Sequence, residues 1–138
     1  MPSEKRTFGD IGESLATRFL MKRGFEIVER NYQKKWGEID IISRETTENV
    51  EKYRFIEVKT VSCENVANIS HETLLKDTRP EEQVHVWKKK RLSRAVQSYL
   101  MEKQISHETP WQCDLVAVFL DRDNRQAKIR VVENILLE

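Results

Sequence analysis

The stretch WGEIDII, residues 36–42, has the apolar content of a buried strand but carries two acidic residues. A second stretch, RFIEVKT at residues 54–60, does the same with an acid and a lysine. Charged side chains rarely enter such strands unless they are paired or bind a metal ion. The two stretches therefore predict the middle of a sheet and, on it, a site built from charged groups.

The side chains of a strand alternate between the two faces of a sheet. On this basis Glu38 and Asp40 share one face of the first strand, and Glu57 and Lys59 share one face of the next. We expect the apolar residues between them to point the other way, into a core: Ile39, Ile41, Ile56 and Val58.

Two helices are predicted around these strands. Residues 11–23 have apolar side chains at helical spacing and are followed by Gly24, a common residue after a helix end. Glu13 lies at the edge of this apolar stripe, where it can reach over the sheet. A capping box at residues 78–81 predicts the start of the second helix, and Lys88 continues the inward-facing stripe of that helix.

The remaining segments complete an α/β pattern. Strands are predicted at residues 25–32, 38–43, 53–61, 112–120 and 127–134. We expect a charged loop at residues 44–52 and a mobile surface loop at residues 62–77. The order α-β-β-β-α-β-β predicts a mixed central sheet flanked by helices.

Composition limits the class of protein. The chain has 138 residues, of which 38% are hydrophobic and 34% charged, and its formal net charge is +1. This balance predicts one globular domain over residues 1–138. No apolar run is as long as a bilayer span, and residues 1–10 lack the apolar segment of a signal peptide. We therefore expect a cytoplasmic protein without a membrane partner.

The cysteines and histidines give little support for a zinc site. Cys63 and Cys113 have no cysteine or histidine at metal-ligand spacing. His71, His85 and His107 form no cluster in the sequence. The search for chemistry is thereby narrowed to carboxylates and lysines.

Asp40, Glu57 and Lys59 converge if their strands are neighbours. Two adjacent carboxylates repel each other and raise each other's pKa, and Mg²⁺ or Mn²⁺ would remove this conflict. Lys59 would then orient or deprotonate an attacking water, or neutralise charge in the transition state. Glu13 would bind the metal directly or through water. The alternative is a salt bridge of Lys59 with Glu57 or Asp40 and no metal, and both readings are open at this point.

A basic run, KKKRLSR at residues 88–94, has five cations in seven residues. Alone, such a run is typical of a solvated helix face. Next to a site for phosphodiesters, it would hold the nucleic-acid backbone without reading its sequence. The candidate phosphate contacts are Lys34, Lys35, Lys88, Lys89, Lys90, Arg91 and Arg94.

The pattern D…E-x-K on successive strands, with an acid from the preceding helix, resembles the PD-(D/E)XK nuclease superfamily, which has the restriction-endonuclease-like fold. More narrowly, the chain resembles the bacterial YraN-like family, which is related to archaeal Holliday junction resolvases. The resemblance covers most of the chain as an ordered series of motifs: GDIGESLA at 9–16, RNY at 30–32, GEID at 37–40, EVKT at 57–60, KKKRLSRAVQSYL at 88–100 and CDLVAV at 113–118.

This resemblance implies an α-β-β-β-α-β core with an added C-terminal strand, and a Mg²⁺- or Mn²⁺-dependent endonuclease that hydrolyses DNA. It implies Asp40 and Glu57 as metal ligands, the Val58 carbonyl as a third ligand, and Lys59 as the catalytic lysine. Glu13 would be the helix-borne acid of the site. The resemblance also implies a role in DNA repair or recombination, with branched or single-stranded DNA as a partner and a homodimer as the assembly.

Two further acids match the motifs without a fixed role. Glu38 either takes part in the site or bonds to the backbone of a neighbouring loop. Asp114 fits the family's strand motif, and we expect it to anchor a strand rather than to act in catalysis.

The chain departs from the family pattern in the second helix. Lys88-Lys89 stands where the family usually has Lys-Gln, and a glutamine near the metal would help to position substrate. Two further readings therefore stay open: a non-catalytic nucleic-acid-binding module with the same fold, and an interaction protein in which the charges form salt bridges.

Overall fold

The computed structural model describes residues 3–68 and 86–136. Its elements are α1 (Glu4–Lys22), β1 (Glu26–Lys34), β2 (Gly37–Thr47), β3 (Val50–Ser62), η1 (Val66–Asn68), α3 (Val86–Glu102), β4 (Trp111–Asp121) and β5 (Gln126–Val132). The five strands form one sheet in the order β1-β2-β3-β4-β5, in which β3 and β4 are parallel and the other neighbours are antiparallel. The predicted mixed sheet flanked by helices is thus confirmed, and it is consistent with a restriction-endonuclease-like core.

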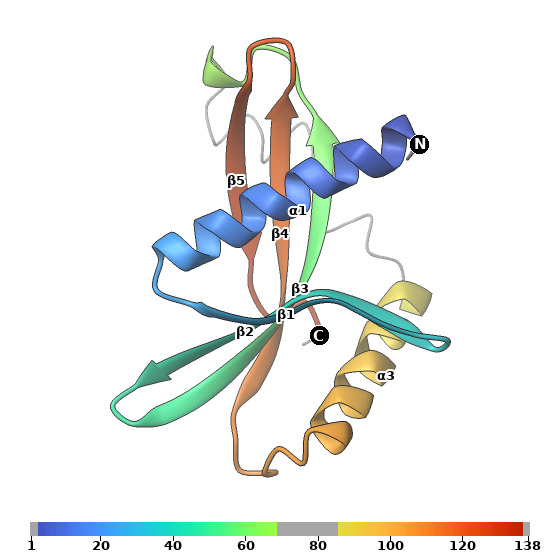
Figure 1. The fold of residues 1–138 in the computed structure, drawn as a ribbon, viewed down its shortest axis with the longest axis vertical. Helices are drawn as coiled ribbons and strands as arrows, with labels where there is room; N and C mark the ends of the chain where they lie inside the picture. Colours follow the sequence, from blue (N-terminus) through green and yellow to red (C-terminus); the bar gives the residue numbers. More distant parts are fainter. Residues whose placement is uncertain (1–2, 69–85, 137–138) are drawn as a thin grey trace.

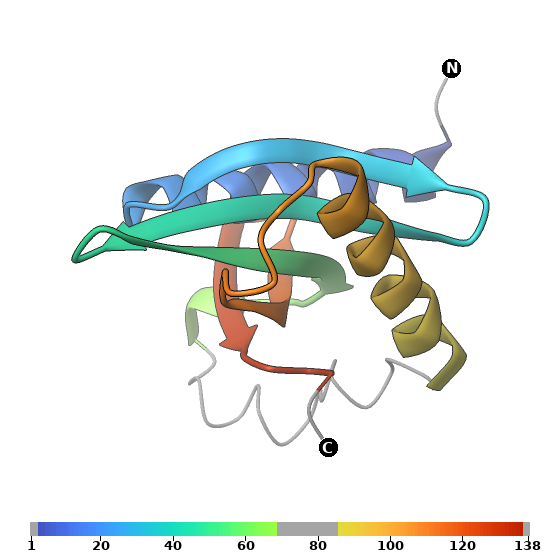
Figure 2. The same cartoon turned by 90° about the horizontal axis from the view of Figure 1, so that it is seen from below.

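The two helices cover opposite faces of the twisted sheet. Helix α1 crosses the half of the sheet that contains β3, β4 and β5, and α3 packs against β2 and β1 (Figures 1 and 2). Strand β4 is buried over almost its whole length because both of its faces are covered. No helix in the described residues is both long enough and apolar enough to span a bilayer.

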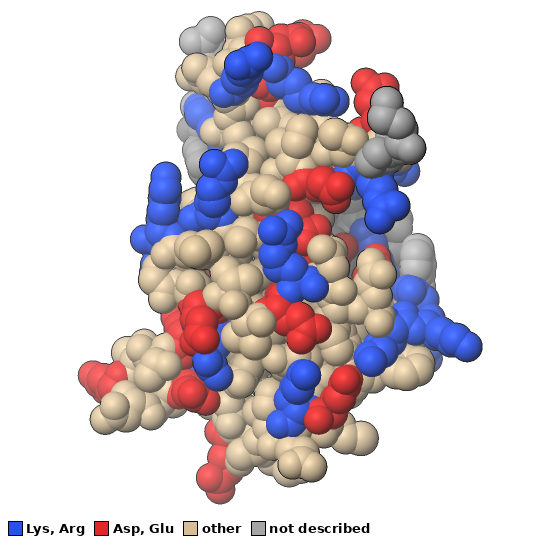
Figure 3. Space-filling model, viewed as in Figure 1, with Lys and Arg blue, Asp and Glu red and all other residues tan. Residues whose placement is uncertain are grey.

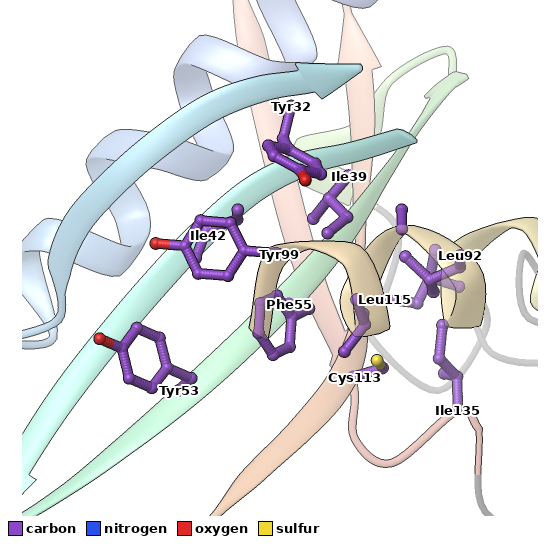
Figure 4. Packing of buried hydrophobic residues seen from close by; sticks show 12 residues of the cluster. Tyr32, Ile39, Ile42, Tyr53, Phe55, Leu92, Tyr99, Cys113, Leu115 and Ile135 are labelled. Carbon is purple, nitrogen blue, oxygen red and sulfur yellow. The ribbon is translucent and has the colours of Figure 1, made fainter. Parts of the chain in front are cut away.

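Each helix closes its own hydrophobic core. Under α1 the fully buried residues include Ala16, Ile56 and Val116. Under α3 the core is aromatic, with the Tyr99 ring centroid 5.4 Å from that of Tyr32 and 5.7 Å from that of Phe55 (Figure 4). Edge-to-face aromatic packing of this kind contributes roughly 0.5–1.5 kcal/mol per pair beyond the buried area. The two cores fix both helices against the strands that carry the predicted site.

Helix α1 begins earlier than the apolar spacing predicted. Ser3 caps it, and the Ser3 hydroxyl accepts a hydrogen bond from the Arg6 backbone N–H at 3.1 Å. The first two turns are mostly exposed and polar, so no apolar period marks them in the sequence.

The charged loop expected at residues 44–52 is instead a tight hairpin, and that prediction was wrong. Strands β2 and β3 stay paired to Thr47 and Val50, and the two turn residues, Glu48 and Asn49, have φ angles of 52° and 67°. Cross-strand ion pairs such as Arg54–Glu45 hold this part of the hairpin. Because this part of the hairpin is polar on both faces, its sequence shows no alternation of apolar and polar residues.

Strands β1 and β2 change faces together near Asp40. Arg30 and its partner Ile41 lie on the α1 side, whereas Tyr32 and its partner Ile39 lie on the α3 side. Between the first pair and the second, Asn31 has a φ of 55°, a left-handed conformation that turns the strand. The prediction that Ile39 and Ile41 point into one core was therefore wrong.

Part of the predicted 62–77 loop is regular structure. Ser62 ends β3, and η1 follows, with Val66 buried and its N–H donated to the Asp121 carboxylate at 3.3 Å. Residues 69–77 and the capping box predicted at 78–81 lie outside the described residues.

Candidate functional site

Asp40 lies where the pairing of β2 with β3 ends. The last pair in register is Ile41 with Ile56. Beyond it, the Asp40 carboxylate accepts a hydrogen bond from the Val58 backbone N–H at 2.7 Å. The Asp40 side chain therefore takes the amide that a paired strand would otherwise use, and this fixes it beside β3.

Glu57 is held by α3. Its side chain is only 12% exposed, and its Oε1 lies 3.3 Å from the Lys88 ammonium. Helix α3 can come this close because β2 begins with a glycine: a Cβ added at Gly37 would lie 2.0 Å from the Arg91 carbonyl oxygen. The inward orientation predicted for Lys88 thus brings its ammonium to a carboxylate of the predicted site.

Glu13 comes from α1 through a second close approach. A Cβ added at Gly12 would lie 1.8 Å from Thr60 Oγ1, so the helix backbone rests directly on β3. Glu13 is almost fully buried, and it accepts a hydrogen bond from Arg30 Nε at 3.2 Å.

Lys59 borders the same hollow as Glu13 and Asp40. Among the residues with described positions, no ion pair joins Lys59 to an acid. The salt bridge that served as the alternative to a metal is therefore not formed by Lys59. Glu57 instead forms an ion pair with Lys88 of α3.

Two adjoining hollows frame these groups. One, of about 360 Å³, is bordered by Asp40, Glu13, Lys59, Lys88, Lys5 and Arg6. The other, of about 210 Å³, is bordered by Glu38, Glu57, Lys88 and Arg91.

The structure separates the acids and lysine that were expected to share a face. Glu38 and Asp40 border different hollows, and so do Glu57 and Lys59. Lys88 borders both.

The two strand carboxylates lack full compensation of their charge. Burial, followed by the charge of Glu57, raises the pKa of Asp40 to about 8, although the Val58 N–H acts in the opposite direction. Burial also raises the pKa of Glu57, and Lys88 offsets part of that increase. Buried carboxylates in this state mark a place where an additional cation would be stabilised.

The donors suit a hard divalent cation in part. Asp40 and Glu57 supply carboxylate oxygens, and Mg²⁺ commonly binds one or two carboxylates and fills its shell with water. Glu13 is engaged by Arg30 instead. Within residues 3–68 and 86–136, no three histidine, cysteine or acidic side chains form a metal-binding group. Among the described residues, Asp40 and Glu57 are therefore the two candidate ligands, and a cation there would take its remaining ligands from water, substrate or a backbone carbonyl.

The predicted phosphate contacts fall into two groups. Lys35, Lys90 and Arg94 are exposed, and Lys89 and Arg91 are half-buried on α3. Lys34 instead pairs with Glu102 at 3.6 Å and lies over the Tyr32 ring. Lysine, arginine and acidic side chains are interspersed over the α1 face, without a broad basic patch (Figure 3).

Two cations of the larger hollow were missed in the sequence. Lys5 and Arg6 border it from the first turns of α1. They were not considered because the helix was expected to begin at residue 11. Ser3 followed by an acidic residue is the capping signal that would have extended the helix to include them.

Asp114 belongs to a separate cluster. Its carboxylate accepts hydrogen bonds from Arg54 Nη1 at 3.0 Å, Gln112 Nε2 at 2.7 Å and the Asn134 N–H at 3.1 Å. It borders a hollow near Leu20, towards the C-terminal end of α1. These contacts tie β3, β4 and the segment after β5 together.

Comparison with known proteins places the chain in a family. Residues 12–118 match the model of the "Uncharacterised protein family UPF0102". The chain is 35% identical over 133 residues to a "UPF0102 protein" of Moorella thermoacetica, covering 96% of this chain and 98% of the relative. It is 33% identical over 130 residues to a "UPF0102 protein" of Caldicellulosiruptor saccharolyticus, covering 94% and 97%. With a family match over most of its length and relatives of almost the same extent, the chain belongs to the UPF0102 family.

Proposed function

We propose that this protein is a metal-dependent nuclease of the PD-(D/E)XK superfamily that hydrolyses DNA phosphodiester bonds. The observation that carries the proposal is the pair Asp40 and Glu57, two partly buried carboxylates on adjacent strands with raised pKa values. Lys59, which forms no ion pair with an acid among the described residues, lies two residues beyond Glu57. A purely structural cluster would be expected to satisfy these acids, as the Asp114 cluster does.

Asp40 and Glu57, with the Val58 carbonyl, would hold Mg²⁺ or Mn²⁺. When bound, such a cation neutralises phosphate charge and makes a coordinated water more acidic. The Val58 N–H keeps the Asp40 carboxylate oriented, and Arg30 keeps Glu13 at the rim of the hollow.

Lys59 would act on the reacting groups. Its ammonium is not committed to an acid in the described structure, so it is available to orient the attacking water or to stabilise charge on the phosphate oxygens. Lys5, Arg6 and Arg91 border the hollows and would hold the flanking phosphates.

We extend the proposal to branched DNA as the substrate class and to DNA repair or recombination as the role. The support is the similarity of the ordered motifs to a family related to junction resolvases. Cutting both strands of a junction would require two sites, and hence a homodimer.

A second candidate function is a non-catalytic nucleic-acid-binding module. It is favoured by Lys89 at the position where a glutamine is usual, and by the lack of a three-side-chain metal group in the described residues. In this reading, Asp40 and Glu57 would tune binding rather than hold a cation for chemistry.

Digestion of labelled duplex, single-stranded and four-way-junction DNA tests the proposal. The native protein should cut in Mg²⁺ or Mn²⁺ and not in EDTA, and Asp40→Asn and Lys59→Ala should each abolish cutting. Asp123→Asn, in the exposed β4–β5 turn, is the control and should cut normally. Cutting that survives both site substitutions would refute the assigned residues, and junction binding without cutting would favour the binding module.

A further inference from the structure

Lys88 forms an ion pair with Glu57, so a divalent cation that binds Glu57 would have to compete with the Lys88 ammonium for this carboxylate. Its ammonium lies 3.3 Å from Glu57 Oε1, and the lysine side chain is 41% exposed while that of Glu57 is 12% exposed. The carboxylate is therefore held in place, whereas the lysine keeps freedom to move.

The backbone that carries Lys88 is firmly placed. Arg91 lies against Gly37, and Leu92 is 4% exposed in the α3 core. Lys88 borders both the Glu57 hollow and the larger hollow of Asp40 and Lys59. Its ammonium can therefore leave Glu57 for the larger hollow by side-chain rotation alone.

Charge determines when this movement is favourable. An ammonium supplies one positive charge to two buried carboxylates, and a divalent cation supplies two. Once a divalent cation is on Glu57, an ammonium at 3.3 Å from the same carboxylate is repelled by it. A phosphate in the adjoining hollow then offers the lysine a better partner.

Building on the proposed function, we propose that Lys88 is a resident counter-ion that exchanges with the metal. It neutralises Glu57 in the metal-free protein, and it transfers to a backbone phosphate of the nucleic acid when a divalent cation binds. Lys88 is thus a positioning residue whose contact depends on the state of the site.

Calorimetric titration with Mn²⁺ tests the first half of the exchange. Lys88→Gln should bind Mn²⁺ about 3- to 10-fold more tightly than the native protein, because the cation no longer displaces an ammonium. Lys88→Arg, which keeps the charge, should stay near native affinity. Lys22→Gln removes the same charge from an exposed position in the last turn of α1, away from both hollows, and is the control, with native affinity expected.

Fluorescence anisotropy with a short single-stranded oligonucleotide tests the second half. In EDTA, Lys88→Gln and Lys22→Gln should bind equally well, since Lys88 is then committed to Glu57. In Ca²⁺, Lys88→Gln should bind about 3- to 10-fold more weakly than Lys22→Gln, because one phosphate contact is lost. Thermal melts followed by circular dichroism establish that each variant is folded.

The outcomes separate this inference from the function on which it rests. If the native protein binds Mn²⁺ and Lys88→Gln binds it no more tightly, the exchange is refuted and the metal site stands. The exchange is also refuted if Lys88→Gln loses the same oligonucleotide affinity in EDTA as in Ca²⁺. If the native protein binds no Mn²⁺, the proposed function fails, and the exchange with it.

Discussion

Asp114 and Asp40 are both carboxylates set into the same sheet, but their surroundings differ. Asp114 is 2% exposed and receives three hydrogen bonds, one of them from Arg54. Among the residues that the structure describes, Asp40 receives one, from the Val58 N–H, and has the acids Glu57, Glu13 and Glu38 near it. The carboxylate of the first cluster is fully paired, whereas the strand carboxylates of the second are only partly compensated, and their pKa values are raised.

The difference shows how a buried acid can be assigned a role. Burial costs an ionised carboxylate several kcal/mol unless partners repay it. Asp114 has those partners, so its contribution is to hold strands together. Asp40 has fewer partners among the described residues, so its ionised form is disfavoured in the metal-free protein and would be stabilised by a ligand that supplies positive charge.

The largest expected effect is on catalysis, and of the two aspartates it concerns only Asp40. Asp40→Asn should lower nuclease activity at least about 100-fold, because a charged ligand of the proposed cation is lost. Asp114→Asn, assayed well below its melting temperature, should stay within a few-fold of native activity. Initial rates of junction cleavage measure both, and equal losses would erase the distinction between the two clusters.

For the free energy of unfolding we expect the reverse order, with a larger effect of Asp114→Asn than of Asp40→Asn. Asp114→Asn should lower the free energy of unfolding by about 3 kcal/mol, because it leaves the Arg54 guanidinium partly unpaired in a buried cluster. In EDTA at neutral pH, Asp40→Asn should be neutral or stabilising, because it removes a carboxylate that is under-compensated. Urea denaturation gives both values, and a large destabilisation by Asp40→Asn would contradict this account.

A smaller effect tests how α1 reaches the acidic site. Gly12→Ala should lower the free energy of unfolding by about 2 kcal/mol, because its Cβ would meet Thr60 Oγ1 at 1.8 Å. Gly9→Ala, on the same helix, meets nothing within 4 Å and should be neutral or raise stability by up to about 1 kcal/mol. Thermal melts compare the two, and equal behaviour would show that α1 adjusts freely over β3.

The most gradual effect is a dependence of stability on pH in EDTA, spread over several pH units. The pKa of Asp40 is raised to about 8 in the folded protein, so between about pH 4 and pH 8 the folded state holds a proton that the unfolded state has released. The free energy of unfolding should therefore fall as pH rises through this window, by at most about 1.4 kcal/mol per pH unit.

Asp40→Asn should flatten this slope, whereas Asp114→Asn should leave it in place. Urea denaturation at several pH values in EDTA measures the slope for each protein. A slope that is the same in Asp40→Asn and in the native protein would assign the titration to another group.

The element order could be predicted from the sequence because the segments that carry it have clear periods. The β4 segment is almost continuously apolar, and α3 shows the helical stripe on which Lys88 precedes Leu92. The same stripe predicted correctly that Lys88 faces inward. Its partner Glu57 could not be predicted, because the distance between β3 and α3 depends on the close approach of Arg91 to Gly37.

Other features leave no periodic trace. The extension of α1 to Glu4 and the hairpin over residues 44–52 are polar, so only cap and turn chemistry could have indicated them. The change of face near Asp40 depends on the left-handed backbone of Asn31, which an asparagine permits but does not require. As a result, the acids of the site were identified by residue type and spacing, while their division between two hollows was not.

The parallel pairing of β3 with β4 also bears on the order of events when the chain folds. Asp40 and Val58 are 18 residues apart in one antiparallel hairpin, so they can meet early, through local contacts. Lys88 reaches Glu57 only when the long crossover has closed, which is entropically slower. In this order, Asp40 and Glu57 come together in the hairpin before Lys88 can pair with Glu57. Because protonation lowers the repulsion between the two acids, we expect refolding to be faster in mildly acidic buffer than in alkaline buffer.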